Sequence, residues 1–203
     1  MALYGKGEAL LPSRSNPKKQ ATRSNPAPLG LMGFGMTTIL LNLLNAEIIS
    51  SSGLGAILAV GIFYGGMAQI IVGILEFKNG STFGTIAFAS YGSFWLSLVA
   101  LLIFPALGWA GAVDPTSMAA YLVLWGIFSI FMFMATLKLK RGLQVVFFTL
   151  VLLFFLLATA DLTGIGIIRI IAGFEGIFCG ASAIYVAAAE VLNEIYKKPV
   201  LPV

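Results

Sequence analysis

Most of the chain consists of long apolar stretches separated by short polar ones. Six of these stretches can each hold the roughly 20 apolar residues that cross a bilayer as a helix. They cover residues 24–46, 48–75, 79–113, 115–137, 142–160 and 162–189. Because backbone groups in lipid must be satisfied within the chain, six helices are favoured over strands. The pattern therefore predicts an all-α membrane protein with six transmembrane helices.

A run with two prolines, NPAPLGL, precedes the first apolar stretch. Asn25 suits the capping position of a helix, and Pro26 suits the first helical position, where no N–H is needed. Pro28 still falls within the first turn, where a missing N–H costs little. We expect a helix start whose free N–H groups attract a carboxylate, with a plain helix start as the alternative.

The composition agrees with a membrane protein and narrows its chemistry. The 203 residues are 59% hydrophobic and 10% charged, whereas soluble domains carry about 25% charge. The chain has no histidine and one cysteine, which excludes imidazole metal sites, histidine-based catalysis and an intrachain disulfide. No phosphate-binding loop, dinucleotide motif or HExxH occurs. We expect no enzyme activity, no cofactor and no metal.

Lysine and arginine are distributed unequally between the two sides of the predicted bundle. With six spans, both chain ends and the turns near 76–81 and 138–142 lie on one side. That side holds Lys6, Arg14, Lys18, Lys19, Arg23, Lys78, Lys138, Lys140, Arg141, Lys197 and Lys198. Only Arg169 lies toward the other side. The asymmetry predicts that both termini are cytoplasmic, and it accounts for the net charge of +4 without nucleic acid as a partner.

The predicted domain organisation has three parts. A basic cytoplasmic tail covers residues 1–24, a six-helix transmembrane domain covers 25–196, and a short tail covers 197–203. Two halves of three spans have opposite orientations, which is a common transporter design. SYGSFW in the third span faintly resembles FEGIFC in the sixth, so 3+3 inverted halves are expected but the sequence leaves a true repeat open.

Polar side chains within the spans are the sharpest functional signal. Asn42 on the first span and Gln69 on the second need a partner or water in hydrocarbon. They either bond between helices or line a path, and neutral groups suit a small polar or anionic solute. Arg169 and Glu175, six residues apart, face opposite sides of an ideal helix. Glu175 and Glu76 are the candidate proton carriers, although a protonated Glu175 facing a neighbouring helix is equally compatible.

Five motifs occur in an order that resembles one known family. They are NPAPLGL at 25–31, GIFYGGMAQ at 61–69, ILEF at 74–77, TFG with SYGSFW at 82–95, and CGASAIY at 179–185. On these motifs the chain resembles the acetate uptake transporter family, which includes bacterial succinate–acetate permeases and fungal acetate and ammonium transport-associated proteins. The resemblance covers nearly all of residues 25–196. It implies a six-helix protomer that assembles as a hexamer, with a path for acetate, or succinate in some members, through each protomer.

The resemblance also implies an apolar constriction made from a phenylalanine, a tyrosine and a leucine. By motif these are Phe34 in LMGFGM, Tyr91 in SYGSFW and Leu150 in VVFFTL, the last on the weakest motif. The residues expected along the rest of the path are Asn25, Thr38, Asn42, Gln69 and Trp95.

Together these expectations predict a protein that transports acetate across a cell membrane. The partners are acetate or succinate, the lipid bilayer and other copies of the chain. Channel-like conduction and proton-coupled symport both remain open. The alternatives are a channel for a neutral solute such as urea and a membrane scaffold or sensor without flux.

Overall fold

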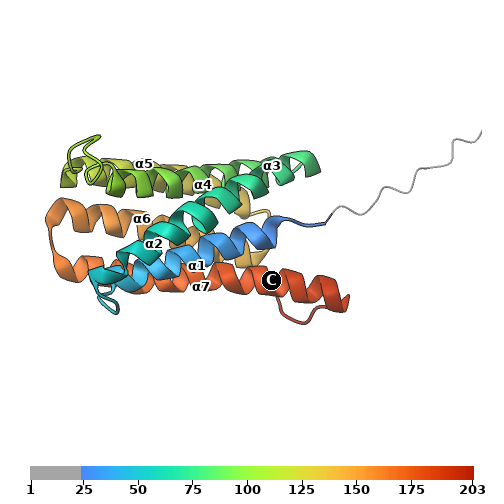
Figure 1. Ribbon diagram of the computed structural model, residues 1–203. Helices are drawn as coiled ribbons and strands as arrows, with labels where there is room; N and C mark the ends of the chain where they lie inside the picture. The colour runs from blue at the N-terminus through green and yellow to red at the C-terminus, as the bar shows by residue number, and fades with distance from the viewer. Residues whose placement is uncertain (1–23) are drawn as a thin grey trace, which may run out of the picture.

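The protein is a bundle of long helices that run back and forth across its length (Figure 1). The structure is a computed structural model that describes residues 24–203, so the predicted basic tail, apart from Ser24, lies outside the described residues. The helices are α1 (Ala27–Asn45), α2 (Leu54–Val60), α3 (Gln69–Asn79), α4 (Thr82–Ile103), α5 (Pro115–Thr136), α6 (Arg141–Thr163) and α7 (Gly166–Tyr196). Two further segments are η1 (Ser51–Gly53) and η2 (Gly61–Ala68).

The second span is assembled from several of these elements. It runs without a break over Ser51–Asn79, and η2 is a π-helical segment between α2 and α3. With this span, the described part of the chain has six helices long and apolar enough to cross a membrane, and it has no strand. The predicted all-α architecture with six spans is therefore confirmed.

The start of α1 differs from the expectation. The helix begins at Ala27, so Pro26 lies before it and Pro28 is its second residue. Asn25 acts from one residue further out, where its Oδ1 accepts a hydrogen bond from the N–H of Ala27 at 3.1 Å. The prediction that Asn25 takes the capping position was wrong by one residue, because its side chain forms an Asx-type turn around Pro26 instead.

Other helix ends follow ordinary capping chemistry. Ser81 accepts a hydrogen bond from the N–H of Gly84 at the start of α4. Asp114 precedes Pro115 at the start of α5 and accepts hydrogen bonds from the hydroxyl and the N–H of Ser117. These two bonds lower the pKa of Asp114 below its usual value.

The first and the last helix share one end of the bundle. The first residues of α1 and the last turns of α7 lie together there (Figure 1). After α7 the chain turns at Lys197, whose φ is 53°, and runs back along the helix. Asn193 holds the returning segment through Val200 and Leu201, and the hydroxyl of Tyr185 donates to the carbonyl of Pro202 at 2.9 Å.

One predicted feature of the charged residues was wrong. α6 continues to Thr163, beyond the apolar stretch expected to end at residue 160, so Asp161 lies in its last turn. Asp161 forms an ion pair with Arg169 on α7. The last two helices thus carry Asp161 in addition to Arg169 and Glu175. Both carboxylate oxygens of Glu175 are buried without a hydrogen-bond partner.

Candidate functional site

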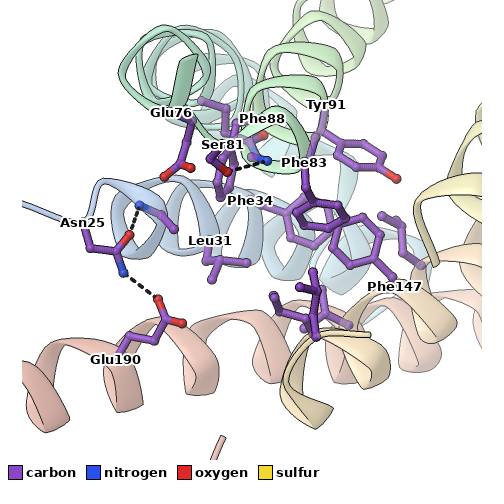
Figure 2. A pocket seen from close by; sticks show the side chains of 18 residues that line it. Asn25, Leu31, Phe34, Glu76, Ser81, Phe83, Phe88, Tyr91, Phe147 and Glu190 are labelled. Atoms are coloured by element: carbon purple, nitrogen blue, oxygen red, sulfur yellow. Dashed lines mark hydrogen bonds between the residues drawn. The ribbon is translucent and has the colours of Figure 1, made fainter. Parts of the chain in front are cut away.

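A pocket with a volume of about 260 Å³ enters the bundle at the end where α1 begins (Figure 2). Its lining comes from α1, α3, α4, α6 and α7 and from the turns that precede α1, α4 and α6. Partly exposed polar groups, among them Asn25 and Glu190, lie at its mouth. At its inner end Phe34, Tyr91 and Leu150 are only 5%, 3% and 3% exposed. The pocket is therefore polar where it opens and apolar where it closes.

Two helices supply half of the residues that line the pocket. Each presents four residues at positions i, i+3, i+4 and i+7, which form one face of a helix. These residues are Gly84, Ala87, Phe88 and Tyr91 on α4, and Leu143, Val146, Phe147 and Leu150 on α6. Since these side chains are hydrocarbon apart from one tyrosine hydroxyl, the wall suits the apolar part of a small solute.

The three predicted constriction residues lie together at the inner end, and we call Phe34, Tyr91 and Leu150 the neck. The rings of Phe34 and Tyr91 are 6.1 Å apart between centroids. Phe147, from the turn before Leu150, lies 5.9 Å from the Tyr91 ring. Aromatic contacts at these distances fix the rings in place. The structure thus places these residues from α1, α4 and α6 in the lining of one pocket.

Gln69 is a buried polar group in the pocket lining. Its side chain lines the pocket and is almost completely buried, yet its Oε1 has no hydrogen-bond partner. Buried amide oxygens are nearly always paired with protein or ordered water. This unpaired acceptor in the pocket is therefore available to water or to a protonated solute.

The predicted polar residues Thr38, Asn42 and Trp95 are not part of the pocket lining. All three are buried in the bundle, and Thr38 Oγ1 and Trp95 Nε1 have no partner. Asn42 donates to the carbonyl of Thr38 at 2.9 Å and accepts from Asn45 at 3.0 Å, so both of these bonds stay within α1. None of the three lines the pocket and both bonds of Asn42 stay within its helix, so these observations support neither the path nor the interhelical alternative.

The mouth is held by an ion pair that the sequence reasoning missed. Glu190 on α7 accepts a hydrogen bond from Asn25 Nδ2 at 3.0 Å, and its other oxygen lies 3.1 Å from Lys140 Nζ (Figure 2 draws the Asn25 bond). The group links the starts of α1 and α6 to α7. The sequence did contain one sign of this site: Glu190 directly follows the apolar stretch that was expected to end at residue 189.

The two candidate proton carriers occupy different places. Glu76 on α3 lines the pocket and is buried, with its carboxylate packed directly against Gly84. Glu175 on α7 is not part of the pocket lining. Within residues 24–203 no group of histidine, cysteine or acidic side chains could hold a metal ion.

Comparison with known proteins places this arrangement in a family. Residues 7–202 match the GPR1/FUN34/yaaH family along nearly the whole chain. The chain belongs to this family. The resemblance found in the sequence motifs is thus confirmed. Among the relatives described next, those whose names state a function are transport proteins and not enzymes.

Relatives from three domains of life are similar to the chain. The succinate-acetate/proton symporter SatP of Escherichia coli K12 is 57% identical over 180 residues, which cover 89% of this chain and 95% of that protein. An uncharacterized protein of Methanothermobacter thermautotrophicus is 53% identical over 186 residues, covering 88% and 90%. Ammonia transport outward protein 2 of Saccharomyces cerevisiae is 34% identical over 178 residues, covering 83% and 61%.

A solved structure agrees with the fold. The structure of the bacterial acetate channel SatP superposes with a TM-score of 0.86 at 57% sequence identity. The match covers 89% of this chain and 99% of that one. The two proteins therefore share the same helical fold.

Proposed function

We propose that the protein transports acetate, with succinate as a second substrate, across a cell membrane through a path in each protomer. The observation that carries the proposal is the pocket whose apolar wall closes at the neck. Membership of a family that includes a succinate-acetate/proton symporter supports it. A similar structure described as an acetate channel gives further support.

Acetate suits the chemistry of this path. Its methyl group tolerates the hydrocarbon of Phe34 and Leu150, and its carboxylate needs donors only before and after the neck. No lysine or arginine lines the pocket. Since conduction needs several weak sites rather than one tight one, a fully cationic site would hold the anion too strongly. We assign the flanking contacts to Asn25, Thr38, Asn42, Gln69 and Trp95.

The coupling of transport to protons has two candidate carriers. Glu76 lies inside the pocket and Glu175 lies within the membrane-spanning part of α7. Carboxylates within membrane-spanning helices are the kind of group that relays protons in transporters. Either residue suits proton-coupled symport, whereas channel-like conduction requires neither.

The position in the membrane follows from charge. Eleven of the twelve lysine and arginine residues fall on one side of six spans, so we place both termini and the pocket mouth in the cytoplasm. The proposed parts are a basic tail over 1–24, a membrane domain over 25–196 and a tail over 197–203. We further propose 3+3 inverted halves and a hexamer, which rest on the family resemblance.

Uptake into proteoliposomes tests this function. We expect purified protein to raise the uptake of labelled acetate above protein-free vesicles, without raising the uptake of labelled urea. The protein-free control is essential because neutral acetic acid crosses bilayers unaided. Repeating the assay with an imposed proton gradient separates the two mechanisms, since accumulation driven by the gradient indicates symport.

The other outcomes identify the alternatives. Protein-dependent uptake of urea, with acetate uptake no higher than in protein-free vesicles, would indicate a channel for neutral solutes. Neither flux, from a well-folded oligomer, would leave a membrane scaffold or sensor. In both cases the neck would not be an acetate filter.

A further inference from the structure

The hydroxyl of Tyr91 is tied to a residue outside the pocket. It lies 2.9 Å from the hydroxyl of Ser129 on α5, a helix that contributes nothing to the pocket lining. Both side chains are buried, and Ser129 is fully so. The bond joins α4 to α5, which also meet through the rings of Phe94 and Tyr121.

The direction of this bond follows from counting protons. The Ser129 hydroxyl also lies 2.8 Å from the carbonyl of Trp125, one turn earlier on α5. A carbonyl can only accept, and a serine has a single hydroxyl proton. Ser129 therefore donates to Trp125, and Tyr91 donates its own proton to Ser129. The tyrosine proton is thus engaged on α5.

Aromatic neighbours keep the Tyr91 ring in the neck. Phe128 contacts it edge-on at 5.3 Å between centroids, and the Phe147 and Phe34 rings lie at 5.9 and 6.1 Å. Because the hydroxyl lies on the ring axis, flips of the ring do not move it. If Ser129 lost its oxygen, the hydroxyl would remain near the neck without a partner, which is costly for a buried donor.

We propose that Ser129 is a positioning residue that sets the selectivity of the neck. By accepting the Tyr91 proton it removes the one polar group of the neck from the path, so that passing solutes meet only carbon. The neck then favours a methyl group over a hydroxyl of the same size. This inference rests on the proposed transport function and extends it to the class of acid that is excluded.

The test compares two acids of equal size. Propionate and glycolate have the same number of heavy atoms and differ by a methyl group against a hydroxyl. In proteoliposomes we expect Ser129→Ala to raise the ratio of glycolate to propionate flux about fivefold, the change that one ordinary hydrogen bond brings. A purely structural loss would alter both fluxes together and leave the ratio in place.

Two matched comparisons isolate the hydroxyl. The side chains of threonine and valine have the same shape, but only threonine keeps a hydroxyl that can accept the Tyr91 proton. Ser129→Val should therefore raise the ratio of glycolate to propionate flux, and Ser129→Thr should not. The second comparison uses Tyr91→Phe, because phenylalanine lacks the hydroxyl that would be freed when Ser129 loses its oxygen. In that background Ser129→Ala should leave the ratio unchanged.

The results separate this inference from the transport function itself. If the unaltered protein carries no acetate, the proposed function fails and the ratio has no meaning. If it carries acetate but Ser129→Ala and Ser129→Val both leave the ratio unchanged, the assignment of Ser129 is overturned. The same conclusion follows if Ser129→Ala raises the ratio equally in the Tyr91→Phe background.

Discussion

Leu150→Ala is expected to raise the flux of lactate and succinate relative to acetate about tenfold, because it widens the neck. An apolar pocket discriminates at least about tenfold between substrates that differ by a single methylene group. Leu150 is buried at the closed end of the pocket and contributes the only aliphatic side chain of the neck. Phe34→Ala removes a larger group from the opposite helix and should act in the same direction.

Leu153 provides the matched control for Leu150. It lies one turn further along α6, is equally buried, and does not line the pocket. Leu153→Ala deletes the same atoms and costs a similar stability, about 3 kcal/mol. We therefore expect Leu153→Ala to leave the relative fluxes unchanged. If Leu150→Ala and Phe34→Ala both left lactate and succinate flux unchanged, the neck would not be the filter.

Gly35→Ala is expected to destabilise the bundle, because α1 and α7 touch through bare backbone at this point. A Cβ on Gly35 would lie 2.6 Å from the carbonyl oxygen of Gly180, and a Cβ on Gly180 would lie 2.6 Å from that of Gly35. Contacts this short oblige one helix to move. Overpacking of this kind costs about 1–3 kcal/mol, and the displaced α1 would carry Phe34 away from the neck.

The measurement is thermal unfolding of the detergent-solubilised protein. Gly55→Ala on α2 is the control, since nothing lies within 4 Å of a Cβ at that position. Alanine is favoured over glycine in a helix by up to about 1 kcal/mol. The two variants should therefore shift the melting temperature in opposite directions. A melting temperature for Gly35→Ala at or above that of the unaltered protein would contradict the close α1–α7 crossing.

The apolar pattern was sufficient to predict the six spans, because length and hydrophobicity alone decide whether a segment can cross a membrane. It could not define their ends. α6 continues through Asp161 because Arg169 neutralises that charge from the next helix. The π-helical segment Gly61–Ala68 was also missed, since glycine spacing indicates close packing without specifying a hydrogen-bonding pattern.

The site could be predicted only where a residue belongs to a motif. Phe34 and Tyr91 lie in such motifs, and the structure places them beside Leu150 at the inner end of the pocket. Glu190 and Ser129 contact Asn25 and Tyr91 from segments distant in sequence. Pairings of that kind depend on how helices pack, which periodicity within one helix does not reveal.

Chemical blocking of the pocket tests most directly that acetate passes through it. Leu143 lines the pocket wall, and the native Cys179 is fully buried, so Leu143→Cys offers one reactive thiol. Lys138→Cys is the control, because Lys138 is exposed before α6 and outside the pocket lining. Both variants are labelled in proteoliposomes with a charged, bulky thiol reagent, and labelled acetate uptake is then measured.

We predict that labelling of Leu143→Cys lowers protein-dependent acetate uptake to the protein-free background, and that an excess of acetate slows the labelling. Labelling of Lys138→Cys should leave uptake intact. If fully labelled Leu143→Cys transported acetate at its unlabelled rate, acetate would cross by another route and the account of this pocket would be wrong.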